Sequence, residues 1–187
     1  MQPQKIAQLR IWTSAPGSQP PLLGRDLVVI EGPLDEAEWD MVRVFAHRLD
    51  REDIRLRFGY LLDLHDEPPL RRAFEIGRSP GEMIWKLDET GAIAGLAHQV
   101  ALSQSDAEFA LIVRSDLKRR GIGEALLRSV LARSEGVRTL RASVLWENRA
   151  MLRLAAKVGY LAGRPSPGSV ELTFAPGGIS DRPAKCP

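Results

Sequence analysis

Apolar residues recur at helical spacing in four stretches of this chain. The four predicted helices cover residues 32–49, a shorter segment that begins at Asp50, residues 122–134, and a segment that follows Asn148. Asp35 and Glu38 have the spacing of a capping box, so they predict where the first helix begins. Between the second and third helices, residues 62–82 are broken by prolines, which predicts a loop containing a short helix.

Alternation of apolar and polar residues predicts strands around these helices. The predicted strands are residues 26–31, three strands within 82–113 that turn at 88–91 and 103–106, and residues 137–146, 160–163 and 169–175. The three middle strands follow one another through short turns, which predicts an antiparallel meander. Together the pattern predicts an α/β fold, with a mixed sheet of about seven mostly antiparallel strands and roughly four helices.

Three tryptophans, Trp39, Trp85 and Trp146, fall in phase with these apolar stripes, so we expect all three in the core. Asn148 is a typical helix N-cap and Gly159 a typical C-terminal stop, and they bound the last predicted helix.

The length of 187 residues predicts one domain, which we place at residues 25–175. Residues 1–24 are rich in Gln, Pro and Ser without periodicity, so we expect a flexible leader, and we expect a disordered tail at 176–187. The single cysteine, Cys186, lies in that tail, which argues against a disulfide framework or a cysteine-based metal site.

Charge and hydropathy narrow the class of partners. The net charge is +2 and the basic residues are scattered, so nucleic-acid binding is not indicated. We find no apolar run of the roughly 18 residues that a membrane span needs, and we expect a cytoplasmic protein. His47, His65 and His98 are widely separated, so we predict packing or surface roles for them and no metal site.

A basic run and two glycines stand at the predicted start of helix 122–134, in the sequence "KRRGIG" at 118–123. Free N–H groups and the positive end of the helix dipole attract an anion to such a place. A P-loop is excluded because Glu124 stands where that motif has lysine, and a dinucleotide fingerprint because its third glycine is Leu126. The simpler alternative is that Gly121 only permits a tight turn.

Two segments carry a resemblance to a known family. The run "ALIVRSDLKRRGIGEALL" at 110–127 resembles the acyl-CoA pyrophosphate loop of the GNAT superfamily of N-acyltransferases, although Lys118 stands where Gln or Arg is commoner. The run "VLWENRAMLRLAAKVGY" at 144–160 is similar to a later motif of that superfamily, in which Asn opens a helix and a Gly-aromatic pair ends it. Within the superfamily, residues 45–59, 106–113 and 144–160 resemble the Pat-type protein lysine acetyltransferases of bacteria.

The resemblance implies a fold with a splayed central strand pair and acetyl-CoA as cosubstrate, without a metal. It implies that Glu108 is the general base, which we expect to be partly buried beside Ala110 and Ile112. The residues expected to bind the cosubstrate are Leu111, Ile112, Val113, Lys118, Arg119, Arg120, Gly121, Ile122, Gly123 and Asn148. Many members have a tyrosine as general acid at the position of Ala155, so that step has no candidate residue here, and Tyr160 is assigned to packing.

Three functions stay open at this point. The first is acetyl transfer to protein lysines, the second is acetyl transfer to a small amine such as a polyamine or aminoglycoside, and the third is a non-catalytic module that senses acyl-CoA. The expected partners are therefore acyl-CoA and an acceptor protein or small amine, with neither nucleic acid nor membrane. The oligomeric state is open, with a homodimer as one alternative.

Overall fold

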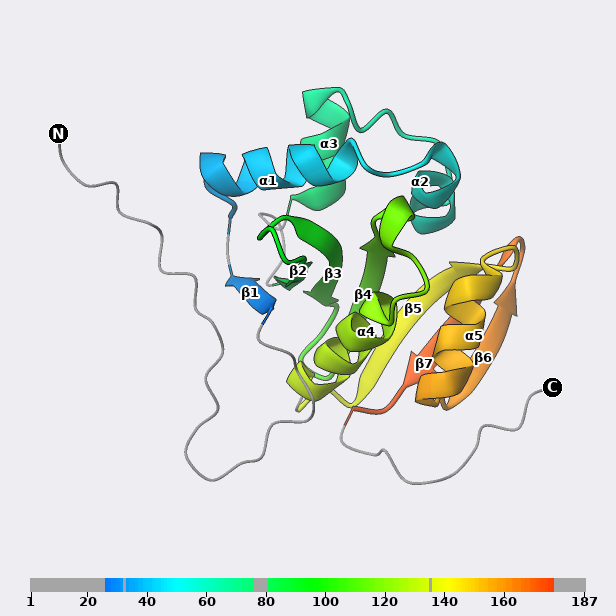
Figure 1. Cartoon of the computed structure of the whole chain (residues 1–187). Helices are drawn as coiled ribbons and strands as arrows, with labels where there is room; N and C mark the ends of the chain where they lie inside the picture. The colour runs from blue at the N-terminus through cyan, green and yellow to red at the C-terminus, as the bar shows by residue number, and fades with distance from the viewer. Residues whose placement is uncertain (1–25, 32, 76–80, 135, 177–187) are drawn as a thin grey trace, which may run out of the picture.

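The computed structural model describes residues 26–31, 33–75, 81–134 and 136–176. The predicted leader 1–24, the tail beyond residue 176 and Cys186 lie outside the described residues, so those predictions stand as they were made. The described residues form a seven-stranded sheet, five α-helices and one short 3-10 turn (Figure 1).

The order of helices and strands is the one that the periodicity predicts. In chain order the elements are β1 (Leu27–Glu31), α1 (Glu36–Ala46), α2 (Arg51–Phe58), α3 (Glu67–Phe74), β2 (Gly81–Leu87), β3 (Ile93–Ala101), β4 (Asp106–Val113), the 3-10 turn η1 (Ser115–Leu117), α4 (Ile122–Arg133), β5 (Thr139–Leu145), α5 (Arg149–Val158), β6 (Ala162–Ser166) and β7 (Ser169–Phe174). The predicted capping box is present, because the Glu38 N–H donates to Asp35 and the Asp35 N–H donates to Glu38, both at 2.8 Å.

The sheet has the strand order β1-β2-β3-β4-β5-β7-β6, and its neighbours are antiparallel except for β4 and β5, which are parallel. The parallel pair is short: residues 106–108 of β4 are in register with residues 139–141 of β5, and the ladder ends there. Beyond Glu108 and Arg141 the two strands separate, so the sheet is forked at its middle. The predicted splayed central pair is confirmed.

Helices cover both faces of the sheet. Figure 1 shows α1, α2 and α3 together at the top of the view, and α4 and α5 in front of the sheet. Alternate side chains of β1–β4 explain the two layers: Met83 and Leu96 join the apolar cluster of α1–α3, whereas Ile84 and Ala97 join the cluster of α4 and α5. Each buried layer therefore depends on one face of the same strands.

A glycine in β3 sets how closely α4 lies against the sheet. A Cβ atom at Gly95 would stand 3.0 Å from Ile122 Cγ2, 3.0 Å from Leu126 Cδ1 and 3.1 Å from the Ile112 carbonyl oxygen. Real Cβ atoms rarely approach other atoms so closely, so a side chain here would force these neighbours to shift by a few tenths of an ångström. Gly95 thereby fixes where the first turn of α4 lies relative to the fork.

Two sequence predictions need correction. Trp39 and Trp85 are buried as expected, but Trp146 is 41% exposed, because β5 ends at Leu145 and the tryptophan begins the following turn. The sixth strand covers residues 162–166 instead of 160–163, and its residues are all exposed because it forms the edge of the sheet.

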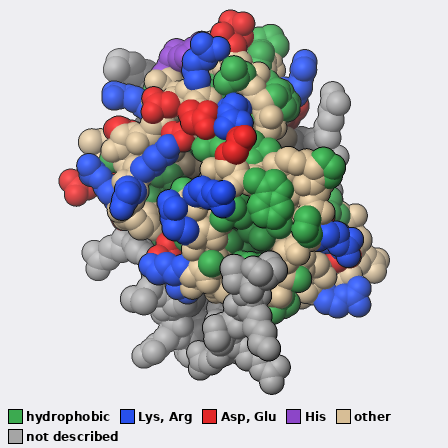
Figure 2. Space-filling model, turned by 90° about the vertical axis from the view of Figure 1, so that its right-hand side faces the viewer, with side chains coloured by type: hydrophobic (Ala, Val, Ile, Leu, Met, Phe, Trp, Pro, Cys, Tyr) green, Lys and Arg blue, Asp and Glu red, His purple; other side chains and the backbone are tan. Residues whose placement is uncertain are grey.

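The surface mixes charges of both signs. Figure 2 shows Lys and Arg side chains interspersed with Asp and Glu on the side of the molecule that it faces. None of the described helices is both long and apolar enough to cross a membrane.

Gly95→Ala is expected to destabilise the fold by about 1–3 kcal/mol through overpacking against α4. A matched control is Gly123→Ala, whose added Cβ would meet Leu154 Cδ2 at 3.4 Å, an ordinary contact. Because alanine favours a helix over glycine, the control is expected to melt at or above the wild-type temperature. Thermal unfolding followed by circular dichroism measures both variants, and equal melting of Gly95→Ala and wild type would contradict the close approach of α4.

Candidate active site

The fork leaves one edge of β4 without a strand partner. Residues Leu111, Ile112 and Val113 are in register with Ala97, Leu96 and Gly95 of β3, but β5 has already separated from them. Their backbone groups that face the fork therefore have no ladder partner among the described strands. Unpaired backbone donors and acceptors of this kind can bind an extended ligand in the way they would bind another strand.

A tight turn at the mouth of the fork presents backbone N–H groups. Gly121 has φ +82° and is the N-cap of α4, where it makes no side-chain cap hydrogen bond. Arg119 has φ +63°, and among the described residues it is the non-glycine residue with positive φ. Left-handed residues next to a helix N-terminus direct consecutive N–H groups toward one point, and Arg119 and Arg120 are exposed beside it. This geometry fits a diphosphate.

The acidic residue in the first turn of α4 is neutralised by its neighbours. Glu124 lies 2.5 Å from Lys157 Nζ and 3.0 Å from Arg128 Nη2, and hydrogen bonds from these two side chains lower the pKa of its carboxyl. Its charge is therefore already paired, so it presents less repulsion to an anion at the turn than a free carboxylate would.

Ile122 and Gly123, which were also predicted to bind the cosubstrate, pack the first turn of α4 against neighbouring elements. Ile122 lies against Gly95 of β3, and Gly123 faces Leu154 of α5. Asn148 accepts a hydrogen bond from the Met151 N–H at 3.1 Å and so caps α5. These residues place the starts of α4 and α5 beside the fork.

Lys118 is paired within the protein. Its ammonium group contacts Asp53 of α2, whose side chain is only 8% exposed and also accepts a hydrogen bond from Ser115 Oγ at 2.5 Å. We expected Lys118 to add charge for the phosphates, whereas the structure places its ammonium on a buried carboxylate. Sequence spacing gave no signal for this pair, because its members are 65 residues apart.

Helix α2 is attached to both sides of the fork. On the β4 side Asp53 contacts Ser115 and Lys118, and on the β5 side Arg55 Nη2 lies 2.7 Å from Glu147 Oε2. The helix therefore lies across the opening between the two strands, on the face opposite to α4.

Glu108 is exposed, contrary to the expectation of partial burial. The reason is that the apolar cluster below α1–α3 draws its described members from β1–β4 and none from β5–β7. Glu108 lies at the boundary of that cluster, in the last pair of the parallel ladder, opposite Arg141. The residue proposed from the resemblance is therefore placed where the strands separate, at the end of the fork.

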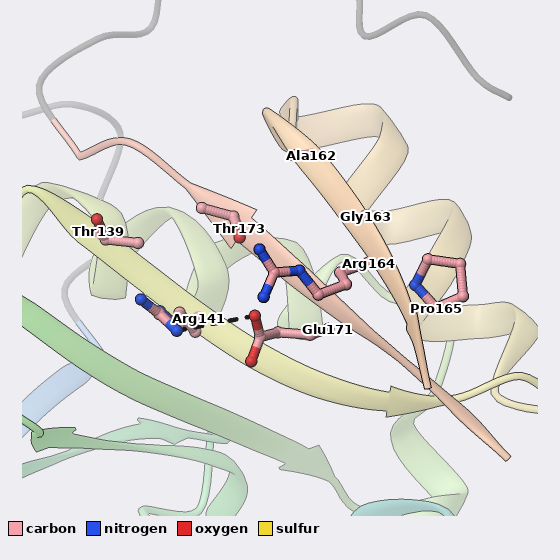
Figure 3. Close-up of a pocket in the computed structure, with 8 residues that line it drawn as sticks. All are labelled: Thr139, Arg141, Ala162, Gly163, Arg164, Pro165, Glu171 and Thr173. Carbon is pink, nitrogen blue, oxygen red and sulfur yellow. Dashed lines mark ion pairs between the residues drawn. The ribbon is translucent and has the colours of Figure 1, made fainter. Parts of the chain in front are cut away.

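A polar cleft adjoins Glu108 on the same face. It has a volume of about 390 Å³ and is lined by Thr139, Arg141, Ala162, Gly163, Arg164, Pro165, Glu171 and Thr173 (Figure 3). Arg141 Nη1 lies 3.8 Å from Glu171, and Arg141 Nη2 lies 3.8 Å from Asp106. Because Arg141 is in register with Glu108, the cleft lies one strand beyond the candidate base.

Two titratable residues on the strands and helix around Glu108, His98 and Arg57, have lowered pKa values that the sequence did not predict. Burial, together with the nearby charge of Arg57, lowers the pKa of His98 to about 4, so its imidazole is neutral at pH 7. Burial also lowers the pKa of Arg57 to about 10, against the opposing attraction of Glu108. In the sequence, the position of Arg57 directly before Phe58, on the apolar side of a predicted helix, was the one feature that could have indicated a partly buried arginine.

The other two histidines come together, although the sequence separates them. His47 Nδ1 and His65 Nδ1 lie 2.7 Å apart at the surface, where the end of α1 meets the loop before α3. Their contact connects the end of α1 with the loop before α3.

Comparison with protein families gives one match that covers most of the site. The model of the Acetyltransferase (GNAT) family matches residues 47–160, which include α2, the fork, the turn before α4 and α5.

Solved structures share the fold at low sequence identity. The GNAT domain of S. lividans PAT is 20% identical with a TM-score of 0.66, and the match covers 80% of this chain and 90% of that one. A spermidine N-acetyltransferase from Vibrio cholerae, solved with CoA and spermine, is 15% identical with a TM-score of 0.60. That match covers 81% of this chain and 96% of the other. A GCN5-related N-acetyltransferase from Kribbella flavida is 20% identical with a TM-score of 0.56, and the match covers 79% of this chain and 95% of the other.

Lys118→Met is expected to lower stability in the absence of any ligand, because it leaves Asp53 buried without its cation. The lysine is about half exposed, so we expect a loss of about 1 kcal/mol, or about 2–4 °C in melting temperature. The double variant Asp53→Asn/Lys118→Met is expected to recover part of the loss. A melting temperature of Lys118→Met equal to that of wild type would contradict the structural role of the pair.

Acidification is expected to destabilise the fold through His98. The unfolded imidazole gains its proton near pH 6.5 and the folded one only near pH 4, so stability falls as the pH decreases between these values. The free energy of unfolding that His98 removes over this range is up to about 3 kcal/mol. Above pH 6.5 none of it is lost, because the imidazole is neutral in both states. Chemical denaturation at pH 7 and pH 4.5 should show that His98→Gln loses less stability than wild type. Equal losses in both proteins would rule out a buried neutral imidazole.

Proposed function

The chain belongs to the GNAT acetyltransferase family, and on this premise we propose that it acetylates lysine side chains of proteins with Glu108 as general base. It is an N-acetyltransferase whose cosubstrate is acetyl-CoA. The observation that carries the proposal is the position of Glu108, in the last residue pair before β4 and β5 separate.

The described residues fit the cosubstrate at both of its ends. The N–H groups at Gly121 and Gly123, with the side chains of Arg119 and Arg120, would hold the diphosphate. The unpaired edge of Leu111–Val113 would align the pantetheine arm and orient the acyl carbonyl. Acetyl-CoA supplies an acetyl group activated as a thioester.

Glu108 would accept a proton from the acceptor amine, directly or through one water. A lysine side chain has a pKa near 10.4, so only about one in 2,500 is neutral at pH 7, and a base next to it increases the nucleophilic fraction. The exposed position of Glu108 supports this role, because a protein-borne lysine must reach the base from solvent.

The charges around Glu108 favour a lysine in an acidic sequence over a free polyamine. Arg141 of the adjoining cleft is shared between Asp106 and Glu171, whereas Arg164, which lines the same cleft, forms no ion pair within 4 Å among the described residues. An unpaired cationic side chain repels a polycation, whereas it attracts an acidic residue that flanks a lysine. The spermidine N-acetyltransferase of V. cholerae shares the fold, so a polyamine acceptor is the alternative to test.

No general acid is needed for this proposal. Ala155 is fully buried within α5, and its methyl side chain has no acidic proton to give to the departing thiolate. A thiol has a pKa near 8.5, which makes the thiolate a good leaving group close to neutral pH.

The proposal is tested by an acceptor panel with acetyl-CoA as donor. The panel contains three peptides that each carry one lysine, flanked by Glu, by Ala or by Arg, and also spermidine. We expect the highest kcat/KM for the Glu-flanked peptide, measured by thiol release and by mass spectrometry of the product. Faster turnover of spermidine than of every peptide would overturn the assignment to protein lysines.

Glu108→Gln is expected to lower kcat by about 10²–10⁴-fold on the best acceptor of the panel, as for loss of a general base. It should leave the thermal stabilisation by acetyl-CoA unchanged, because the diphosphate turn is intact. Glu89→Gln, at an exposed turn between β2 and β3, is the matched control and should keep the wild-type kcat. Wild-type turnover by Glu108→Gln would remove Glu108 from the mechanism.

A further inference from the structure

The segment that leads from β4 to the turn before α4 depends on side chains of other elements for its position. It consists of Arg114, the 3-10 turn η1 and Lys118, and a 3-10 turn of three residues is held only weakly by its own hydrogen bonds. Its first residue is fixed by ion pairs, because Arg114 Nη1 lies 2.8 Å from Asp88 and Arg114 Nη2 lies 2.8 Å from Asp116.

The rest of the segment is held by one carboxylate of α2. Ser115 Oγ donates a hydrogen bond to Asp53 Oδ2 at 2.5 Å and accepts one from the Asp50 N–H at 2.8 Å. The ammonium group of Lys118 contacts Oδ1 of the same Asp53 carboxylate. Asp53 therefore fixes the first residue of η1 and the residue that directly follows its last.

Stability alone gives a weak reason for a charge at this position. Asp53 is the buried carboxylate of the described residues, with 8% of its side chain exposed. Removing a carboxylate from water costs free energy that an attached cation offsets only in part. Such a pair can instead select one arrangement of the chain over others, because every other arrangement leaves a charge without its partner.

The arrangement next to this pair contains a strained residue. Directly after Lys118, the backbone of Arg119 has φ +63°. A residue with a Cβ atom is strained in this region, and the strain persists only where the surrounding structure holds the conformation. On one side of Arg119 that structure is Lys118 on Asp53, and on the other it is the first turn of α4, where Ile122 packs against β3.

We propose that Asp53 is a positioning residue for acetyl-CoA. Through Ser115 and Lys118, it keeps residues 119–121 in the conformation whose N–H groups bind the diphosphate. This inference rests on the proposed binding of the diphosphate at that turn. The alternative is that Lys118 itself binds the phosphates, in which case Asp53 competes with the ligand for the lysine.

The substitution Asp53→Asn separates these alternatives by the sign of its effect. Asparagine has nearly the same volume and can still accept the hydrogen bond of Ser115, but it lacks the charge that holds Lys118. If Asp53 positions the turn, the Kd for CoA rises in this variant. If Asp53 competes for the lysine, the released ammonium group binds the phosphates and the Kd falls.

The test measures the Kd of CoA by titration calorimetry for wild type, Asp53→Asn, Lys118→Met and the double variant, each also melted without ligand. S-acetylpantetheine is used as a second acetyl donor in turnover assays, because it has the thioester and the pantetheine arm but no diphosphate. Asp50→Asn is the matched control, since it removes a negative charge from an exposed residue at the N-terminus of the same helix.

We expect Asp53→Asn and Lys118→Met each to raise the Kd of CoA about 5–30-fold, because the strained turn then becomes a minor conformation. The double variant should bind CoA about as weakly as either single variant, because the two side chains act as one unit. The kcat/KM for S-acetylpantetheine should be unchanged in Asp53→Asn, and Asp50→Asn should match wild type with both donors.

A Kd of CoA in Asp53→Asn that equals or falls below the wild-type value would overturn the inference. An equal loss of kcat/KM with S-acetylpantetheine would also overturn it, because the damage would then extend beyond the diphosphate turn. Should Asp53→Asn fail to fold, Ser115→Ala removes only one hydroxyl group from the cluster, and a wild-type Kd in that variant would overturn the inference. An unchanged Kd in Arg120→Glu would instead overturn the proposed diphosphate site, which separates the two failures.

Discussion

The short parallel ladder between β4 and β5 is the constraint on which the rest of the structure depends. Its three residue pairs hold the two strands together at one end, and their separation beyond Glu108 and Arg141 leaves the opposite end open. The free edge of β4, the N-terminus of α4 and the cap of α5 all meet at that opening. A ladder continued by several more pairs would give a regular sheet with no place for a ligand between its strands.

Polar and charged contacts gather around the fork, while packing below the helices is largely apolar. Asp53 is buried with Ser115 and Lys118, and Arg57 and His98 have buried nitrogens without partners. Elsewhere the buried residues of the described core are mostly aliphatic and aromatic, and the two buried serines, Ser129 and Ser134, donate hydrogen bonds to carbonyl groups of α4. Burial of polar groups has a cost that packing must offset, so their concentration here is consistent with selection for function at this site.

Local sequence signals predicted the elements well because their causes are local. The capping box of α1, the cap of α5 by Asn148 and the meander of β2–β4 depend on residues within a few positions of each other. The burial of Glu108 was predicted wrongly, because exposure depends on which distant helix covers its neighbourhood. The contacts of Lys118 with Asp53 and of His47 with His65 were not predicted for a related reason, because they join segments that are far apart in the sequence and meet only in the folded chain.

The fork also divides the molecule mechanically. Strands β5, β7 and β6 form a continuous antiparallel unit, and its backbone meets the rest of the sheet through the three pairs of the parallel ladder. Two further backbone hydrogen bonds, from the Arg138 and Thr139 N–H groups to the Ser105 carbonyl, reinforce the closed end of the fork. The apolar cluster under α4 and α5 includes Phe109 of one half and Phe174 of the other, so the closed end acts as a hinge that is held by packing, and any change in the width of the opening must occur at the other end.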